Sequence, residues 1–291
     1  MNKLFFSFLF LFLSFSHNTF AQQWKRNRLE YTAGLGISNF LGDLGGADRI
    51  GTNGLRDLEI SLTRPSVLGG VRYHLLKDLR VKGQLTYIRL NGNDALTKEP
   101  ARNFRNLRFR SPVIELTAMG EYYLMQEKSG HLFKLRGVKG RKGFKWNIYA
   151  TAGLGIFWFN PKGPLNGKWY ALQPLQTENV RYSRINVAIP FGFGVRHTID
   201  KQWSVNFELI MRKTFTDYID DVSTDYQDYN TILQERGPVA AYFSDPGGQG
   251  KHPWTQAGEQ RGDPNDKDAY ISAIISVNYK LLHRRRNLPK F

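Results

Sequence analysis

The sequence of 291 residues contains no cysteine. Disulfide frameworks, cysteine-based metal sites and thiol catalysis are therefore excluded. Long apolar runs are also missing, because after residue 21 no segment approaches the roughly 18 uninterrupted apolar residues of a transmembrane helix. Negative charge is scarce, with 25 Asp and Glu against 41 Lys and Arg. The mean hydropathy of −0.45 is that of a polar chain, but barrel strands give a weak hydropathy signal because half of their residues are polar.

The N-terminal residues have the pattern of a secretory signal peptide. Lys3 gives a positive start, an apolar run rich in Phe and Leu follows, and Ala21 is a small residue at the expected cleavage point. Serines interrupt the apolar run, which makes a retained anchor helix the weaker alternative. We therefore expect residues 1–21 to be removed.

Residues 146–159 show a two-residue period that recurs along the chain. Every second residue from Trp146 to Trp158 is apolar and uncharged, whereas the other parity is mixed and is small or polar at mid-strand. Side chains alternate across a strand, so one face is apolar along its whole length. With Trp at both ends, the pattern is typical of a strand between lipid and lumen. For one stretch alone, a strand of a soluble sandwich is the simpler interpretation.

Seven further segments repeat this period: residues 30–41, 66–75, 79–87, 114–124, 185–199, 203–212 and 269–282. Long connections follow the first, third, fifth and seventh strands, tight turns follow the second and sixth, and a basic connection follows the fourth. The even strand number and single apolar parity predict an all-β fold, an eight-stranded antiparallel transmembrane β-barrel with long extracellular loops. We expect residues 22–283 to form this outer-membrane barrel and residues 284–291 to form a basic periplasmic tail. A large soluble barrel or sandwich is the alternative, but soluble strands rarely keep one face free of charge through so many repeats.

The inward parity carries charges of both signs, which we expect to pair and fill the lumen. An eight-stranded barrel is barely wide enough inside for its own side chains, so no open pore is expected. Each carboxylate could be read as catalytic, but ion pairing is the favoured role. The predicted lumen ion-pair residues are Arg72, Arg80, Lys82, Glu115, Glu121, Arg196, Glu208 and Arg212. Pro190 interrupts the sixth strand and is expected at a bulge or kink, because proline cannot donate to the ladder.

Motifs for catalysis or metal binding are weak. The acidic loop at residues 217–228 contains Asp217, Asp220, Asp221, Asp225 and Asp228, a spacing compatible with calcium ligation. It lacks the ordered ligand positions and the glycine of a calcium loop, so a solvated loop is favoured. The sequence has no glycine-rich phosphate loop and no nucleophile elbow. We expect no enzymatic activity, no cofactor, no metal site, no nucleic acid and no small-molecule substrate.

Two sets of basic residues remain. The first set, in the loop after the third strand, is Arg102, Arg105, Arg108 and Arg110. These side chains should face outside or lie at the rim, where they contact lipid phosphates or cap the barrel. The second set lies at the periplasmic mouth and comprises Lys128, Lys134, Arg136, Lys139, Arg141, Lys142, Lys145, Arg284, Arg285, Arg286 and Lys290. It forms a candidate docking surface for a periplasmic protein, with inner-leaflet headgroup contact or plain solvation as the alternative.

Four stretches resemble signature segments of the PorG-type outer-membrane barrels of Bacteroidota. They are GISNFLGDLGG at residues 36–46, FRNLRFRSPVIE at 104–115, DYIDDVSTDY at 217–226 and NDKDAYI at 265–271. The resemblance implies a component of the type IX protein secretion system, in which the barrel ties a periplasmic ring of PorK- and PorN-like proteins to the outer membrane. It also implies a role in gliding motility in some relatives.

The sequence and the resemblance together predict a monomeric, non-enzymatic barrel that is integral to the cell outer membrane. Its expected partners are outer-membrane lipid and the periplasmic ring proteins of type IX secretion. The competing hypothesis is an outer-membrane adhesin or lipid-binding barrel that acts through its extracellular loops, above all through residues 216–268.

Overall fold

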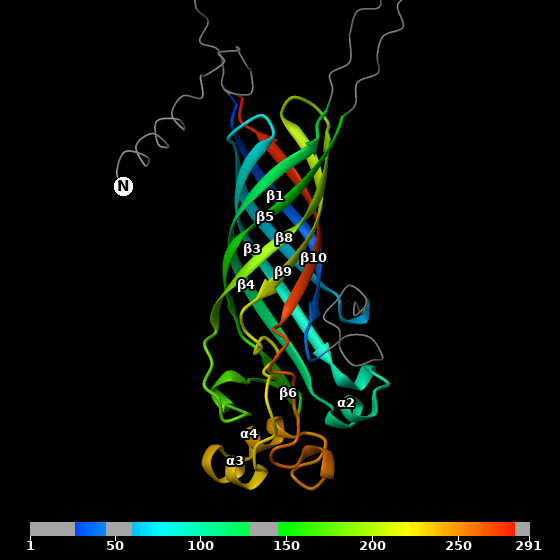
Figure 1. Ribbon diagram of the computed structural model, residues 1–291, viewed down its shortest axis with the longest axis vertical. Helices are drawn as coiled ribbons and strands as arrows, with labels where there is room; N and C mark the ends of the chain where they lie inside the picture. The colour runs from blue at the N-terminus through cyan, green and yellow to red at the C-terminus, as the bar shows by residue number, and fades with distance from the viewer. Residues whose placement is uncertain (1–26, 45–59, 128–144, 283–291) are drawn as a thin grey trace, which may run out of the picture.

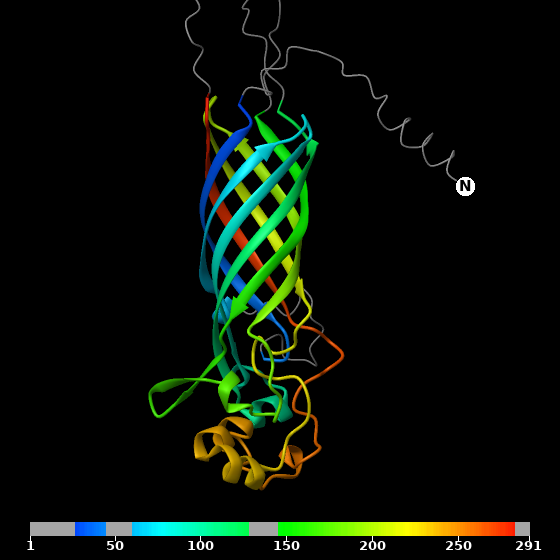
Figure 2. The same cartoon turned by 90° about the vertical axis from the view of Figure 1, so that its left-hand side faces the viewer.

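Eight long strands form a closed antiparallel barrel in the computed structural model, which describes residues 27–44, 60–127 and 145–282 (Figure 1 and Figure 2). The barrel strands are β1 (Leu29–Leu41), β2 (Arg64–His74), β3 (Leu79–Asn93), β4 (Arg108–Met125), β5 (Trp146–Phe159), β8 (Ile185–Thr198), β9 (Trp203–Thr214) and β10 (Ala269–Lys280). Each strand pairs with the next one in this order, and β10 pairs with β1 to close the barrel. The eight-stranded barrel predicted from the sequence is confirmed.

The remaining elements gather at one end of the barrel, which we call the loop end (Figure 1). They are the hairpin of β6 (Lys162–Leu165) and β7 (Lys168–Ala171), the helices α2 (Pro100–Arg105), α3 (Tyr229–Arg236) and α4 (Pro238–Ser244), and the short 3-10 helices η3 (Ile60–Leu62), η4 (Asp94–Leu96), η5 (Gln173–Leu175) and η6 (Pro253–Thr255). The opposite end, where tight turns join β2 to β3 and β8 to β9, is the turn end. Among the described residues, no helix is long and apolar enough to cross a membrane.

Strand residues alternate between buried and exposed in the sense opposite to a soluble barrel. In β3, Lys82 and Thr86 are buried, whereas Leu85 between them is exposed. Leu35 of β1 and Phe193 of β8 expose 69% and 65% of their surface. The apolar parity therefore faces outward and the polar parity faces the lumen, as the sequence period predicts.

The hairpin of β3 and β4 is longer than the sequence period indicates. The predicted loop at residues 91–110 is shortened at both ends, because β3 continues to Asn93, which pairs with Arg108 at the start of β4. Most outward residues of this extension, including Arg89 and Arg110, are polar. The apolar period that marks a strand in the sequence therefore stops before the strand does.

Pro190 lies within β8 without the bulge considered from the sequence. The ladder between β5 and β8 is interrupted after Ala152 pairs with Phe191 and resumes where Gly155 pairs with Ala188. The register is unchanged across the gap, so no residue is inserted. The strand accommodates the proline by leaving the ladder unpaired at the position where proline has no N–H to donate.

Towards the loop end, the inside of the barrel is filled by an apolar core. Phe40 of β1 packs against Phe109 of β4 with ring centroids 5.0 Å apart, and both side chains are buried. Ile219, Val222 and Phe243 of the last long connection belong to the same buried cluster. We call the connecting segments at residues 94–107, 160–184 and 215–268 the cap, because they lie over this end of the barrel (Figure 2). Their apolar side chains contribute to the buried cluster.

Candidate functional site

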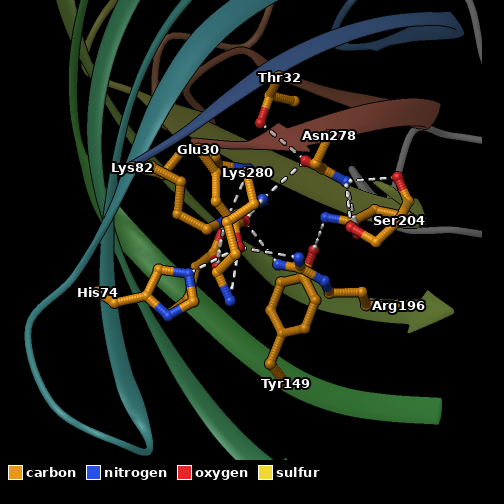
Figure 3. A network of polar contacts seen from close by, with 12 residues as sticks. Glu30, Thr32, His74, Lys82, Tyr149, Arg196, Ser204, Asn278 and Lys280 are labelled. Carbon is orange, nitrogen blue, oxygen red and sulfur yellow. Dashed lines mark hydrogen bonds and ion pairs between the residues drawn. The ribbon is translucent and has the colours of Figure 1, made fainter. Parts of the chain in front are cut away.

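Charged side chains of opposite sign converge in the lumen on the side of the turn end (Figure 3). Arg72 Nε lies 2.8 Å from Glu121 Oε2, and Lys82 Nζ lies 2.7 Å from Glu208 Oε1. The two pairs are linked, because Arg72 Nη2 lies 3.7 Å from the same Glu208 oxygen. Such buried charges are tolerated only when each has partners, because the low-dielectric interior penalises an isolated charge.

Glu30 is a lumen residue that the sequence argument missed. It is fully buried and lies 2.8 Å from Arg196 Nη1 and 2.8 Å from His74 Nε2. Arg72 Nη1 and Lys280 Nζ lie farther away, at 3.4 Å and 3.8 Å. Its parity could have identified it as a lumen residue, because Glu30 lies on the polar side of the first strand. Its position at the end of the strand made this assignment uncertain from the sequence.

A separate pair lies farther along the lumen, where it meets the apolar core. Arg212 Nε lies 2.7 Å from Glu115 Oε2, and Arg212 Nη1 donates to Ser272 Oγ at 2.7 Å. The Arg212 guanidinium carbon lies over the Tyr270 ring, 5.3 Å from the ring centroid, and the Tyr270 hydroxyl donates to Glu115 Oε1 at 3.3 Å. Tyr270 also belongs to the buried apolar cluster, so it joins the charged lumen to the core.

The lumen is packed with side chains. Arg72, Lys82, Tyr149 and Arg212 are among the largest side chains that are buried almost completely. Arg80, the remaining predicted member, lies with its guanidinium carbon 3.8 Å from the centroid of the Tyr123 ring. Side chains rather than an open channel occupy this part of the barrel.

The acidic loop expected to be solvated is largely buried in the cap. Asp217, Asp220 and Asp221 expose only 3%, 1% and 2% of their surface, whereas Asp225 and Asp228 are exposed as expected. The prediction of a solvated loop is therefore wrong for the first three residues. Within the described parts of the chain, no group of three or more Asp, Glu or His side chains is placed to hold a metal ion.

Buried carboxylates in the cap connect segments that are distant in sequence. Asp220 accepts hydrogen bonds from the backbone N–H of Leu44 and of Val222, both at 3.0 Å. Asp268 accepts one from the backbone N–H of Ile219 at 2.8 Å. These bonds satisfy backbone groups of irregular loops that lack a strand partner, which explains why carboxylates are retained there.

The buried carboxyls of the cap, and Asp43 beside them after β1, hold their protons more tightly than usual. Burial raises the pKa of Asp43 to about 6 and that of Asp217 to about 7. Burial and the neighbouring carboxyls also raise the pKa of Asp220 and Asp268 well above the usual range. The Arg105 guanidinium acts against the burial effect at Asp43 and Asp220, lowering the pKa of both. The cap is therefore partly protonated near neutral pH.

Two buried arginines connect the cap segments. Arg105 Nε lies 2.7 Å from Asp94 Oδ2, and the same guanidinium donates to the backbone carbonyls of Asp43 and Arg261. Arg261 Nη1 lies 2.6 Å from Glu178 Oε1. The sequence leaves two roles open for the first basic set, contact with lipid phosphates and capping of the barrel. Arg105 caps the barrel and does not contact the lipid side. The sequence argument did not identify Arg261 or Glu178.

A cavity of about 250 Å³ opens into the surface of the cap. Its lining includes Glu99, Arg102, Tyr226, Trp254 and Asp263. The Trp254 side chain is half exposed. The cavity combines one large aromatic surface with charged groups of both signs.

The periplasmic basic set lies almost wholly outside the described residues. Lys145 is described, and it is exposed next to the first residue of β5 at the turn end. The members outside the described residues are Lys128, Lys134, Arg136, Lys139, Arg141, Lys142, Arg284, Arg285, Arg286 and Lys290. The predicted signal peptide and C-terminal tail lie outside them as well.

The fold and its filled lumen define a closed eight-stranded antiparallel β-barrel with a folded cap. Residues 3–236 match the family described as Domain of unknown function (DUF6089), and the chain belongs to this family. A comparison with curated protein sequences gave no match.

Three solved structures illustrate the similarity of fold. Neisserial surface protein A (NspA) is 11% identical with a TM-score of 0.40, over 87% of this chain and 97% of that one. Ail, the attachment invasion locus protein of Yersinia pestis, in complex with the heparin analogue sucrose octasulfate is 9% identical with a TM-score of 0.37, over 87% and 99%. A second structure of Ail is 7% identical with a TM-score of 0.37, over 88% and 99%.

Proposed function

We propose that this protein is an integral outer-membrane barrel that works as a structural and docking component, without enzymatic activity and without an open channel. The observation that carries the proposal is the inversion of the barrel, with an apolar outer wall around a charged, filled lumen. An exposed surface of this kind is stable in hydrocarbon, whereas in water it would expose a large apolar patch.

The outer wall has the band structure of a membrane-spanning barrel. Exposed aromatic side chains lie towards the turn end on five strands: Tyr31, Tyr73, Tyr122, Trp146 and Trp203. From there towards the loop end, the outward positions of the barrel strands carry no Asp, Glu, Lys or Arg until Arg89, Arg110 and Lys213. Aromatic rings prefer the membrane interface and charges prefer water or headgroups, so the uncharged band corresponds to the hydrocarbon layer.

The finer part of the proposal is a role in type IX protein secretion, in which the turn end docks a periplasmic ring of PorK- and PorN-like proteins. The resemblance of the four sequence stretches supports this role. Chain topology supports it too, because β4 ends, β5 begins and β10 ends at the turn end. The two basic segments of the sequence are therefore attached at the same mouth, where their charges add to one another.

Charge reversal tests the docking role. A variant with Lys139, Lys142, Arg284, Arg285 and Arg286 changed to Glu is compared with a matched variant in which five loop-end cations, Lys168, Arg181, Arg184, Lys213 and Lys251, are changed to Glu. We expect the turn-end variant to lose the ring proteins that co-purify in detergent and to lose secretion, while the loop-end variant retains both. Normal co-purification and secretion by a correctly inserted turn-end variant would contradict the proposal.

The second candidate is an adhesin or lipid-binding barrel that acts through its cap. It is favoured by the cap cavity, in which the half-exposed Trp254 lies near His252 and Phe104. Exposed aromatic rings are frequent anchors of binding surfaces. Under this alternative, Trp254→Ala reduces adhesion of intact cells and leaves secretion unchanged, whereas under the docking role it changes neither.

A further inference from the structure

We propose that the outer wall of the barrel binds the phosphate group of a phosphorylated glycolipid in the outer leaflet, through Arg89 of β3, Arg110 of β4 and Lys162 of β6. We call these three residues the wall cations. The inference rests on the proposed insertion in the outer membrane, and it adds a ligand site that is separate from the ion pairs of the lumen and from the cavity of the cap.

The strand register places the wall cations on one outward patch. Arg110 lies opposite Lys162 in the ladder between β4 and β6. On its other side Arg110 lies opposite Asn91 of β3, and Arg89 is two residues from Asn91 on the same face. Direct and diagonal neighbours across a ladder are within side-chain reach, and like charges there repel. A bound anion would relieve this repulsion.

A surface cavity of about 210 Å³ lies between these side chains. Its lining includes Tyr87, Arg89, Arg110, Ser111, Pro112 and Lys162 and contains no carboxylate. In the described ranges, none of the wall cations has a salt bridge to Asp or Glu, in contrast to the paired arginines of the lumen. The patch therefore has net positive charge and the size to admit a phosphate group.

Trp169 of β7 supports the Arg110 side chain. The guanidinium carbon of Arg110 lies 3.8 Å from the centroid of the Trp169 ring. Stacking on an aromatic face restrains a guanidinium and leaves its N–H groups free to donate in its plane. That geometry matches the bidentate hydrogen bonding by which arginine recognises phosphate.

The position of the patch along the barrel selects a lipid headgroup as the source of the phosphate. Tyr87 is exposed on the outer wall, and Arg89 is the next outward residue of β3 towards the loop end. Two residues of a strand advance about 7 Å. Tyr at the membrane interface thus places Arg89 and Arg110 at headgroup depth. The loop end is the extracellular end of the proposed barrel, so the leaflet is the outer one.

The test uses the full chain in nanodiscs and vesicles that contain diphosphorylated lipid A. A variant with Arg89→Gln, Arg110→Gln and Lys162→Gln is compared with a matched variant, Lys168→Gln, Arg181→Gln and Lys251→Gln, which also removes three loop-end cations. We expect the first variant to bind lipid A at least about tenfold more weakly, because a hydrogen bond to a charged group is worth more than one decade of affinity. We expect the matched variant to bind as the parent protein does.

Three further measurements separate the outcomes. Dephosphorylated lipid A should bind the parent protein as weakly as diphosphorylated lipid A binds the wall-cation variant, and equal binding of both lipids would overturn the inference. Inorganic phosphate that binds the patch as tightly as lipid A does would also overturn it, because the lipid would then contribute nothing. Detergent-resistant, heat-modifiable migration on a gel verifies that each variant is folded.

The result distinguishes this inference from the proposed function. If the wall-cation variant inserts normally and binds lipid A like the parent protein, the lipid site is wrong while the membrane barrel and its docking role stand. If the parent protein is recovered as a water-soluble monomer without detergent, the membrane barrel itself is wrong and the lipid site falls with it.

Discussion

The lumen and the cap both bury charged side chains, but they balance charge in different ways. In the lumen, Glu30 and Glu121 each lie within reach of buried cations. In the cap, Asp217 and Asp220 lie in an acidic cluster in which burial first, and then the neighbouring carboxyls, raise the pKa of both groups. The comparison indicates that the lumen balances its buried carboxylates with cations. The cap contains two such buried ion pairs, but it also buries aspartates that hold protons and accept backbone hydrogen bonds.

The largest expected effect comes from breaking the lumen network at its most connected carboxylate. Glu30→Ala leaves Arg196 and Arg72 buried with one partner fewer, and removing one member of a buried ion pair costs about 3 to 5 kcal/mol. Denaturant unfolding of the barrel in detergent, followed by the loss of heat-modifiable migration, measures the change in free energy. Glu259→Ala, at an exposed position in the cap, is the control. Equal effects of the two changes would contradict the account of the lumen.

The second largest loss of stability is expected from a charge placed on the outer wall of the barrel. Ala150→Arg places a charge on the outward face of β5 near the middle of the strand, where we expect a cost of about 2 to 4 kcal/mol in a lipid environment. Thr151→Asn, on the buried lumen face of the same strand, should be mild. The same unfolding measurement in lipid vesicles compares the two variants. Equal tolerance at the two positions would reverse the assignment of the faces.

Replacing a buried carboxylate by its neutral amide should cost the cap and the lumen different amounts of stability. In the cap, Asp268→Asn keeps an oxygen that accepts the backbone hydrogen bond from Ile219 and removes a charge that burial disfavours, so its cost should stay within about 1 kcal/mol at neutral pH. In the lumen, Glu121→Gln removes the charge that balances Arg72 and Lys82, and its cost should be larger. Thermal or denaturant unfolding of the pair measures the difference. A larger effect in the cap than in the lumen would reject the comparison.

The smallest expected effect is a pH dependence confined to the cap. The pKa values of Asp43, about 6, and Asp217, about 7, exceed those of the unfolded chain, which are about 3.9. The folded cap therefore binds more protons, so these groups lower its stability at pH 8 and that cost is relieved as the pH falls from about 7 to about 4. Hydrogen exchange within residues 215–268, corrected for the intrinsic rate, should be slower at pH 5 than at pH 8.

The barrel strands are the control for this pH effect, and their exchange should change little over the same range. Faster exchange of the cap at pH 5 would contradict the sign derived for Asp43 and Asp217. A change of equal size in the strands would show that the response is not a property of the cap.

The strands could be predicted from the sequence because their signal is local. A residue such as Leu85 faces lipid because it alternates with polar neighbours, and that alternation is visible within about ten residues. The burial of Asp220 could not be predicted this way. Its hydrogen-bond donor at Leu44 is 176 positions away, and no local pattern shows that the two loops meet.

The same distinction separates the members of the first basic set. Arg105 and Arg110 are close in sequence and chemically alike, yet Arg105 is buried against Asp94 in the cap and Arg110 lies on the outer wall against Trp169. The end of α2 and the start of β4 decide which side each faces. The sequence therefore predicts the same role for both arginines, although the fold places them in different environments.

By itself, the sequence determined the strand number, the inward and outward faces and the charged character of the lumen, because a period of two residues is a local consequence of strand geometry. Only the tertiary structure decided that Glu30 is bound by Arg196, that the acidic loop is buried, and that Arg110 joins Lys162 on the wall. These outcomes depend on which distant segments closure of the barrel brings together, and the interaction energies of buried charges depend on those neighbours rather than on the residue alone.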